Sequence, residues 1–330
     1  MDREKRIQVI LEEHYNIHAK RIVQLKGGWS ALAYLIVDDK KKYFLKVYDK
    51  SRAASANWIK AIDQYMPIVE WLHCHTKLKK HVVKPTLTNT EMYSCDDGDM
   101  VYVLSSFIEG YTIGNRPLKR EQVNEIAKII GILHRSKDDV PKHLIKKLPQ
   151  ENFNIEFCRS LFAFIKKDLL SKQDVVLRIV RPFTGYLLDN IKRMKYLAET
   201  LKKKPKQYVL CHGDAHYWNM IQGKRIKLID WECAMLAPPE QDLILHVTGQ
   251  NTETFLDFYK QYGSSHELDL DALEFYFLKR RLEGIWEWIQ DLRNEEVIKS
   301  KEETVRLLKL NLIECTKVTG FRAYLETVYN

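Results

Sequence analysis

The sequence predicts an α+β fold with two lobes, a small β-rich N-terminal lobe followed by a mostly helical C-terminal lobe. Three observations lead to this prediction. β-prone runs broken by glycines or charged turns fill the chain between residues 19 and 47. Apolar residues at helical spacing dominate the chain beyond residue 118. Residues 208–230 interrupt those helices with short β-prone runs.

The N-terminal lobe is expected to combine a small sheet with one main helix. Apolar residues at helical spacing predict a leading helix over residues 4–15. Three β-prone runs, which we expect to form antiparallel hairpins, follow at residues 22–25, 31–37 and 43–47. A helical region comes next at residues 52–78, and Pro67 should kink or divide it. Further strands are expected at residues 82–83, 92–93 and, with a stronger pattern, 101–107.

The C-terminal lobe is expected to be helical around a small β-prone island. Helices are predicted over residues 119–137, 151–170, 172–203, 240–247, 252–262, 269–293 and 296–328. The island should contain strands at residues 208–211, 220–221 and 226–229. The two lobes are therefore placed at residues 1–106 and 119–330, with a connector at residues 107–118.

Bulk composition excludes several classes of protein. With 330 residues, of which 45% are hydrophobic, the chain can bury a sizeable core. Its net charge is +9, and its lysines are spread along the chain, which favours solvated faces over a nucleic-acid-binding surface. The six cysteines form no CxxC pair. The N-terminus is charged, and no run approaches the roughly 20 apolar residues of a membrane span. We expect a cytoplasmic protein that binds neither nucleic acid nor membrane.

The most informative stretch contains His212-Gly213-Asp214, then Asn219, and Asp230 after a later β-prone run. Phosphoryl transfer from ATP needs one carboxylate that orients and deprotonates a hydroxyl, and an amide and a second carboxylate that hold metal. The order of these residues matches that need, with Asp214 as base and Asn219 and Asp230 as metal ligands. The alternative is an Asx-type turn that only satisfies backbone donors. The recurrence of Asp230 after another strand favours the catalytic interpretation.

Lys46 is a charged residue inside a β-prone apolar run and follows Gly28 along the chain. It is either an edge-strand lysine with its ammonium in solvent or, as we favour, a lysine that reaches the α- and β-phosphates. Such a lysine usually needs a carboxylate from the following helix, and the shorter spacing favours Asp63 over Glu70. Gly28 and Ser30 form an ordinary hairpin turn or bring backbone amides and a hydroxyl to the phosphates.

Three side chains near the motif have less defined roles. His212 is expected to be a structural hydrogen-bonding residue, and His216 is assigned no role. Glu232 is either a contact to metal or substrate or an ordinary strand-end carboxylate. One acidic helix face, which is solvated or receives a cationic substrate, is formed by Glu283, Glu287 and Asp291.

These motifs resemble the aminoglycoside phosphotransferase and choline kinase family of small-molecule kinases. The resemblance spans residues 20–290. It rests on His212-Gly213-Asp214 with Asn219, Ile229-Asp230-Trp231-Glu232, Phe107-Ile108-Glu109-Gly110 and Gly131-Ile132-Leu133-His134. Residues 235–243 are most similar to the spectinomycin phosphotransferase branch.

The resemblance implies a protein-kinase-like bilobal fold with ATP between the lobes. It implies that Lys46 holds the α- and β-phosphates, that Asp214 is the base, and that Asn219 and Asp230 bind Mg²⁺. The hinge that contacts adenine through its backbone would include Ser105, Phe107 and Ile108. The DFG and APE segments of protein kinases are absent from the sequence, which favours a small molecule over a protein substrate.

We therefore expect an ATP- and Mg²⁺-dependent phosphotransferase that modifies a hydroxyl of a small acceptor. An aminoglycoside or aminocyclitol, which is hydroxylated and cationic, is the first expectation. A choline-, homoserine- or sugar-like metabolite is the second. The alternative from another class is a catalytically silent kinase-fold protein that binds ligands or partners. The complete set of metal-ligand residues argues against it, because a scaffold does not need them.

Overall fold

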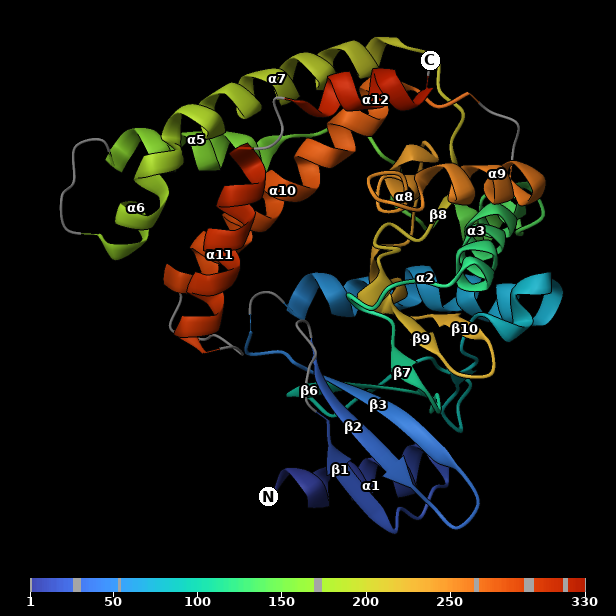
Figure 1. The fold of residues 1–330 in the computed structure, drawn as a ribbon. Helices are drawn as coiled ribbons and strands as arrows, with labels where there is room; N and C mark the ends of the chain where they lie inside the picture. The colour runs from blue at the N-terminus through green and yellow to red at the C-terminus, as the bar shows by residue number, and fades with distance from the viewer. Residues whose placement is uncertain are drawn as a thin grey trace. The chain divides into compact units, whose positions relative to one another are not determined.

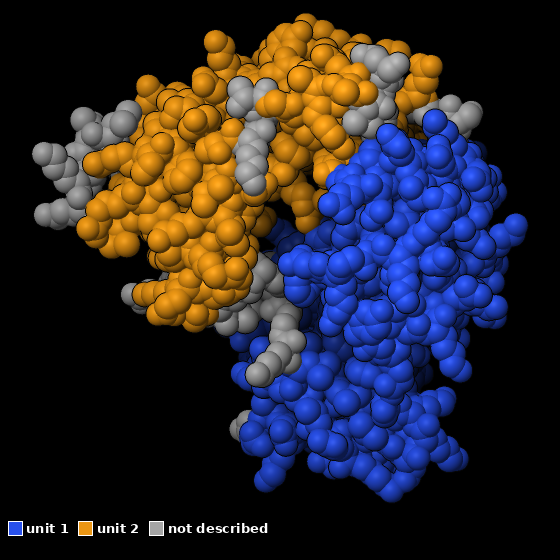
Figure 2. Space-filling model, viewed as in Figure 1, with its two compact units in different colours: residues 1–149, 209–236, 249–265 blue, residues 150–208, 237–248, 266–330 orange. Residues whose placement is uncertain are grey.

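The structure of the protein is a computed structural model that describes residues 2–25, 31–52, 55–168, 174–263, 267–293, 300–316 and 320–329. The chain forms two compact units, shown in blue and orange in Figure 2. The first unit comprises residues 1–149, 209–236 and 249–265, and the second comprises residues 150–208, 237–248 and 266–330. The lobe boundaries at residues 107–118 are a different division of the chain and stay a prediction.

An antiparallel sheet forms one part of the first unit (Figure 1). Its strand order is β1-β2-β3-β6-β4, and β5 pairs with β6. The strands are β1 (Arg21–Gln24), β2 (Leu32–Val37), β3 (Lys42–Asp49), β4 (Pro85–Thr86), β5 (Cys95–Asp96) and β6 (Met100–Ser106). The predicted hairpins and the strand predicted at residues 101–107 are confirmed. Successive side chains of a strand point to opposite faces, so Lys46 lies on the face opposite to Leu45 and Val47.

Two of the expected short strands are wrong. Val82 follows the 3₁₀-helix η1 (Lys77–Lys80), and its N–H donates to the carbonyl of Leu78 at 3.0 Å. Met92 lies in a turn, where its carbonyl accepts from the N–H of Thr88 at 2.9 Å. In both places local turn hydrogen bonds use the backbone groups that a strand ladder would need.

The leading helix α1 (Arg3–Tyr15) covers one face of the sheet and confirms the helix predicted over residues 4–15. Ile7 and Leu11 are fully buried in the same core as Leu45. At the edge of this core, Arg6 forms an ion pair with Asp99 at 2.9 Å. The opposite face of β3 therefore remains available for the site.

The main helix of the first unit is α2 (Ser55–His75). Pro67 lies inside this helix without dividing it. The buried face of the helix carries Ile62, Tyr65, Met66, Ile68, Val69 and Leu72. Asp63 lies off that face and is exposed. The helix therefore contributes apolar and phenolic side chains to the interior of the unit.

The rest of the first unit contains the predicted β-prone island, which is confirmed. β7 (Tyr111–Thr112) pairs with β9 (Met220–Gln222), and β9 pairs with β10 (Ile226–Leu228). β8 (Val209–Cys211) pairs with β11 (Met235–Ala237). The helices of this part are α3 (Arg120–Arg135), α4 (Lys142–Ile145) and α9 (Thr252–Tyr262), and α3 packs against α9.

The second unit is helical and is built around α10. Its helices are α5 (Glu156–Asp168), α6 (Val175–Val180), α7 (Thr184–Lys203), α8 (Glu240–Leu243), α10 (Leu270–Arg293), α11 (Lys301–Thr316) and α12 (Phe321–Tyr329). Arg193 on α7 binds Glu274 on α10 through both carboxylate oxygens, at 2.7 and 2.6 Å. Among the described residues, no helix is long and apolar enough to cross a membrane.

Two of the predicted long helices are each divided. The helix expected over residues 172–203 is α6 and α7, joined by the 3₁₀-helix η3 (Arg181–Phe183). Pro182 has no N–H to donate to a continuous helix, which accounts for the interruption. The helix expected over residues 296–328 is α11 and α12.

Gly131 allows α3 and α9 to pack closely, and its replacement tests that contact. A Cβ at Gly131 would lie 2.7 Å from the backbone nitrogen of Gly263. Because backbone atoms cannot swing aside, Gly131→Ala should lower the free energy of unfolding by about 1–3 kcal/mol in urea denaturation. Gly284→Ala is the matched control, since its Cβ would approach Asn311 only to 3.6 Å. We expect that variant to be unchanged or stabilised by up to roughly 1 kcal/mol. Equal stability of the two variants would contradict the close packing.

Candidate functional site

The loop after β8 carries the predicted base in a crowded backbone. Gly213 has a φ of 82°, in the region that favours glycine. A Cβ at this position would lie 2.1 Å from the carbonyl oxygen of Cys233. The loop therefore passes directly against the 3₁₀-helix η5 (Trp231–Cys233), with no room for a side chain at residue 213.

His212 fixes this loop, as predicted for a structural histidine. It is fully buried, and its Nε2 lies 2.9 Å from the carbonyl oxygen of Ile229. Its Nδ1 accepts from the N–H of Asp214 at 3.3 Å. Because one ring nitrogen faces an acceptor and the other a donor, the pattern fits a neutral imidazole protonated at Nε2. His212 thus links the loop to the strand that ends before Asp230.

Asp214 and Asn219 face each other. The Nδ2 of Asn219 donates to the Oδ2 and to the backbone carbonyl of Asp214, each at 2.9 Å. His216, to which the sequence assigned no role, places Nε2 3.3 Å from the same Oδ2. The Nδ1 of His216 accepts from the N–H of Asn219 at 3.1 Å, which leaves Nε2 as the donor. His216 is therefore a site residue that the sequence did not identify, and its place beside Asp214 depends on the turn of η4 (Tyr217–Asn219).

Asp230 and Lys46 form an ion pair at 2.7 Å. Burial raises the pKa of Asp230, but the ammonium of Lys46 outweighs it and holds that pKa below its usual range. Burial likewise opposes the charge of Lys46, yet Asp230 and Glu232 raise its pKa well above the ordinary value. Asp230 adopts left-handed backbone angles, with φ 62° and ψ 63°. Such a conformation costs about 1–2 kcal/mol in a non-glycine residue.

The predicted pairing of Lys46 with Asp63 is corrected, because Lys46 contacts Glu232 and Asp230. Asp63 is exposed, because the rotation of α2 about its axis turns Ile62 and Tyr65, rather than Asp63, toward the interior. The alternative carboxylate, Glu70, accepts a hydrogen bond from the hydroxyl of Tyr93 at 2.6 Å.

A cavity in the first unit begins at this ion pair. Its charged end contains Lys46, Asp230 and Glu232. Its other walls are largely apolar and include Phe44, Val69, Val103, Ile221 and Leu228. The predicted hinge residues Ser105, Phe107 and Ile108 also line it. An apolar slot with a charged end fits a flat base attached to phosphates.

The predicted hinge continues from the end of β6. The N–H of Phe107 donates to the carbonyl of Lys42 on the neighbouring strand at 3.1 Å. This bond extends the β3–β6 ladder to the wall of the cavity. The predicted nucleotide contacts Gly28 and Ser30 lie outside the residues that the structure describes.

The residues predicted to hold Mg²⁺ fit that ion by their chemistry. Mg²⁺ prefers oxygen ligands, and Asn219 and Asp230 supply an amide and a carboxylate. The N–H of Ile229 donates to the carbonyl of Asn219 at 3.0 Å, so the backbones of these two ligand segments are adjacent. The carboxylate of Asp230 already attracts one cation, the ammonium of Lys46.

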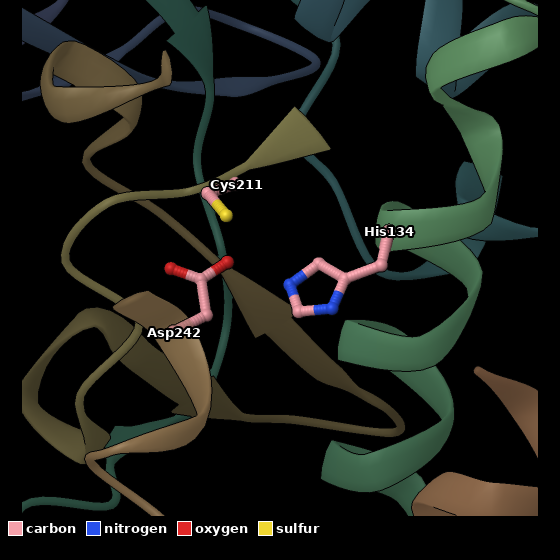
Figure 3. A group of neighbouring side chains, drawn as sticks. All are labelled: His134, Cys211 and Asp242. Atoms are coloured by element: carbon pink, nitrogen blue, oxygen red, sulfur yellow. The ribbon is translucent and has the colours of Figure 1, made fainter. Parts of the chain in front are cut away.

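Behind the loop, the end of α3 packs against β8. The side chain of His134 points from α3 toward Cys211 on β8 (Figure 3). Both residues are buried, and the Nδ1 of His134 lies 2.8 Å from the hydroxyl of Tyr259. This buried packing supports the strand from which the loop emerges.

Comparison with known protein families matches residues 21–276 to the phosphotransferase enzyme family. The chain belongs to this family. The resemblance predicted from the sequence motifs is thereby confirmed. One curated relative of this chain, Protein StrN of Streptomyces griseus, is 24% identical over 180 residues, which cover 49% of this chain and 54% of that protein. The chain therefore spans about half the length of the curated relative it matches.

Several solved structures share the fold of this chain. Spectinomycin phosphotransferase APH(9)-Ia, in complex with ADP and spectinomycin, has a TM-score of 0.72 and 22% identity, with 94% of this chain and 96% of that chain covered. Amicoumacin kinase hAmiN, in complex with AMP-PNP and Ca²⁺, has a TM-score of 0.64 and 17% identity, with coverage of 95% and 93%. Choline kinase LicA from Streptococcus pneumoniae has a TM-score of 0.60 and 18% identity, with coverage of 95% and 99%. The predicted kinase-like fold class is confirmed.

Gly213→Ala tests the crowding of the loop after β8. The new methyl group would overlap the carbonyl oxygen of Cys233, and the φ of 82° would be strained. We expect the loop to shift, with a loss of unfolding free energy of about 1–3 kcal/mol, measured by chemical denaturation. Gly249→Ala is the control, because a Cβ there has no atom within 4 Å. A Gly213→Ala variant as stable as the control would contradict the observed loop geometry.

Proposed function

We propose that this phosphotransferase moves the γ-phosphoryl group of ATP, with Mg²⁺, to a hydroxyl of a small-molecule acceptor. The observation that carries the proposal is the grouping of Lys46, Asp214, Asn219 and Asp230 in the first unit, beside an apolar cavity. These side chains supply a base, an ammonium for the phosphates and oxygen ligands for a cation.

Asp214 would orient the acceptor hydroxyl and take its proton. The Nδ2 of Asn219 and the Nε2 of His216 contact the carboxylate through Oδ2 and orient it toward the hydroxyl that it would receive. The acceptor oxygen forms a bond to the γ-phosphorus while the bond from that phosphorus to the β–γ bridging oxygen breaks. The proton passes to Asp214, and ADP leaves with the electrons of the broken bond.

Lys46 would hold the α- and β-phosphates at the charged end of the cavity. Its ammonium is half-enclosed by carboxylates and therefore stays protonated. The hinge residues Ser105, Phe107 and Ile108 would contact adenine from the opposite wall. Asn219 and Asp230 would hold Mg²⁺, which supplies neutralisation of phosphate charge when bound.

An aminoglycoside or aminocyclitol is the acceptor class that we favour. It is supported by the similarity in fold to spectinomycin phosphotransferase. The similarity to choline kinase favours the second candidate, an amino alcohol or another small metabolite. Use of ATP by this protein would place it in the cytoplasm, and its cysteines, which form no disulfide among the described residues, fit a reducing compartment.

The acceptor class is tested with a panel of aminoglycosides, aminocyclitols, amino alcohols and sugars, and transfer of labelled phosphate from Mg·ATP is measured. We expect turnover of at least one aminoglycoside or aminocyclitol, and reduced drug susceptibility in a host that expresses the protein. Turnover restricted to amino alcohols or sugars would replace the favoured acceptor with a metabolic one. No transfer, together with no thermal stabilisation by Mg·ATP, would favour the binding-protein alternative.

Asp214→Asn separates nucleotide binding from phosphoryl transfer. The amide cannot accept the hydroxyl proton, so kcat should fall about 10²- to 10⁴-fold. The affinity for Mg·ATP, measured by calorimetry, should change little because the phosphate contacts of Lys46 remain. Asp189→Asn makes the same chemical change on the exposed face of α7 and serves as the control. Undiminished turnover in Asp214→Asn would remove the base assignment.

A further inference from the structure

The carboxylates that contact Lys46 come from residues 230–232 and not from α2. The ammonium of Lys46 contacts the Oε1 of Glu232, which lies on η5, and Asp230 at 2.7 Å. These two carboxylates differ in burial, since the side chain of Glu232 is 5% exposed and that of Asp230 is 41% exposed. The more exposed carboxylate is accessible to an incoming cation, whereas the buried one is enclosed with the lysine.

Two phenolic side chains, Tyr48 from β3 and Tyr65 from α2, lie near Glu232. The hydroxyl of Tyr48, on the same strand as Lys46, donates to the Oε1 of Glu232 at 2.9 Å. Tyr65, on the buried face of α2, lies beside Tyr48 and Glu232. Both tyrosines are almost fully buried. A buried carboxylate requires such donors as well as a counter-ion, and here both are provided.

The backbone around Glu232 is held on both sides. Trp231 is buried, and its indole N–H donates to the carbonyl of Leu228 at 3.2 Å. The indole also packs edge-on against His212, with ring centroids 4.7 Å apart. On the other side, the carbonyl of Cys233 lies against Gly213. Glu232 is therefore attached to the same rigid segment as Asp230 and the catalytic loop.

We propose that Glu232 is the positioning residue for Lys46 and does what a carboxylate from α2 was expected to do. Tyr48 and Tyr65 keep the side chain of Glu232 in position. The inference rests on the proposed binding of ATP phosphates by Lys46. On nucleotide binding, Asp230 is the carboxylate that turns to the cation, while Glu232 keeps the ammonium in position. The short segment of residues 230–232 thus positions the ammonium of Lys46 and also carries the proposed cation ligand, Asp230.

The experiment measures ATP affinity by calorimetry, once with Mg²⁺ and once with EDTA. Glu232→Gln should weaken ATP binding about 10- to 100-fold in both conditions, as expected for losing a charge-assisted hydrogen bond. In a Lys46→Met background the same substitution should have no further effect, because Glu232 acts through the lysine. Glu121→Gln, an exposed residue in the first turn of α3, is the matched control.

Two results would overturn the inference while leaving ATP binding in place. An effect of Glu232→Gln that appears only with Mg²⁺ and persists in Lys46→Met would make Glu232 a metal ligand. Unchanged ATP affinity in Glu232→Gln would show that the lysine needs no such anchor. Wild-type protein that binds no ATP would instead overturn the proposed function, and this inference with it.

Tyr48→Phe keeps the test decisive if Glu232→Gln does not fold. It removes only the hydroxyl that donates to Glu232. We expect a smaller loss of ATP affinity, about 3- to 10-fold, again independent of Mg²⁺ and absent in the Lys46→Met background. A Tyr48→Phe protein with full ATP affinity would remove the phenolic support from the proposal.

Discussion

The burial of one ammonium between two carboxylates is the interaction on which the site depends. Lys46 comes from β3, whereas Asp230 and Glu232 follow β10. Breaking a buried ion pair by removing one partner costs about 3–5 kcal/mol of stability. The contact therefore holds the six-stranded sheet, which carries Lys46, against the segment that carries Asp230 and Glu232. It also keeps Lys46 charged despite burial.

Close backbone packing gives the remaining site residues their positions. Gly213 leaves no space between the catalytic loop and Cys233, and Asp230 accepts left-handed backbone angles one residue before η5. The carboxylate of Asp214 is held by Asn219 and His216, which both belong to the following turn. Positions determined by backbone contact vary little, and catalysis by positioning requires this precision.

Candidate residues for the predicted roles could be chosen from the sequence because few residue types can fill such roles. The proposed reaction needs a base, two oxygen ligands for a metal and a cation for the phosphates. These needs led to Asp214, Asn219, Asp230 and Lys46, and the structure brings these residues together. The partner of the lysine could not be predicted in the same way. Several carboxylates have suitable spacing, and the choice depends on the rotation of α2 about its axis, which turns Asp63 to the surface.

The sequence by itself determined the β-rich N-terminal region, the later helices with their β-prone island, the motif residues and the membership of a kinase-like class, because hydrophobic periodicity and restricted chemistry are local properties. Only the tertiary structure decided that Glu232 contacts Lys46, that His216 supports Asp214, and that residues 82–83 and 92–93 are turns. The reason is physical. Each of these outcomes depends on which atoms distant or competing segments bring within hydrogen-bond distance, and that information is not contained in the spacing of residues along the chain.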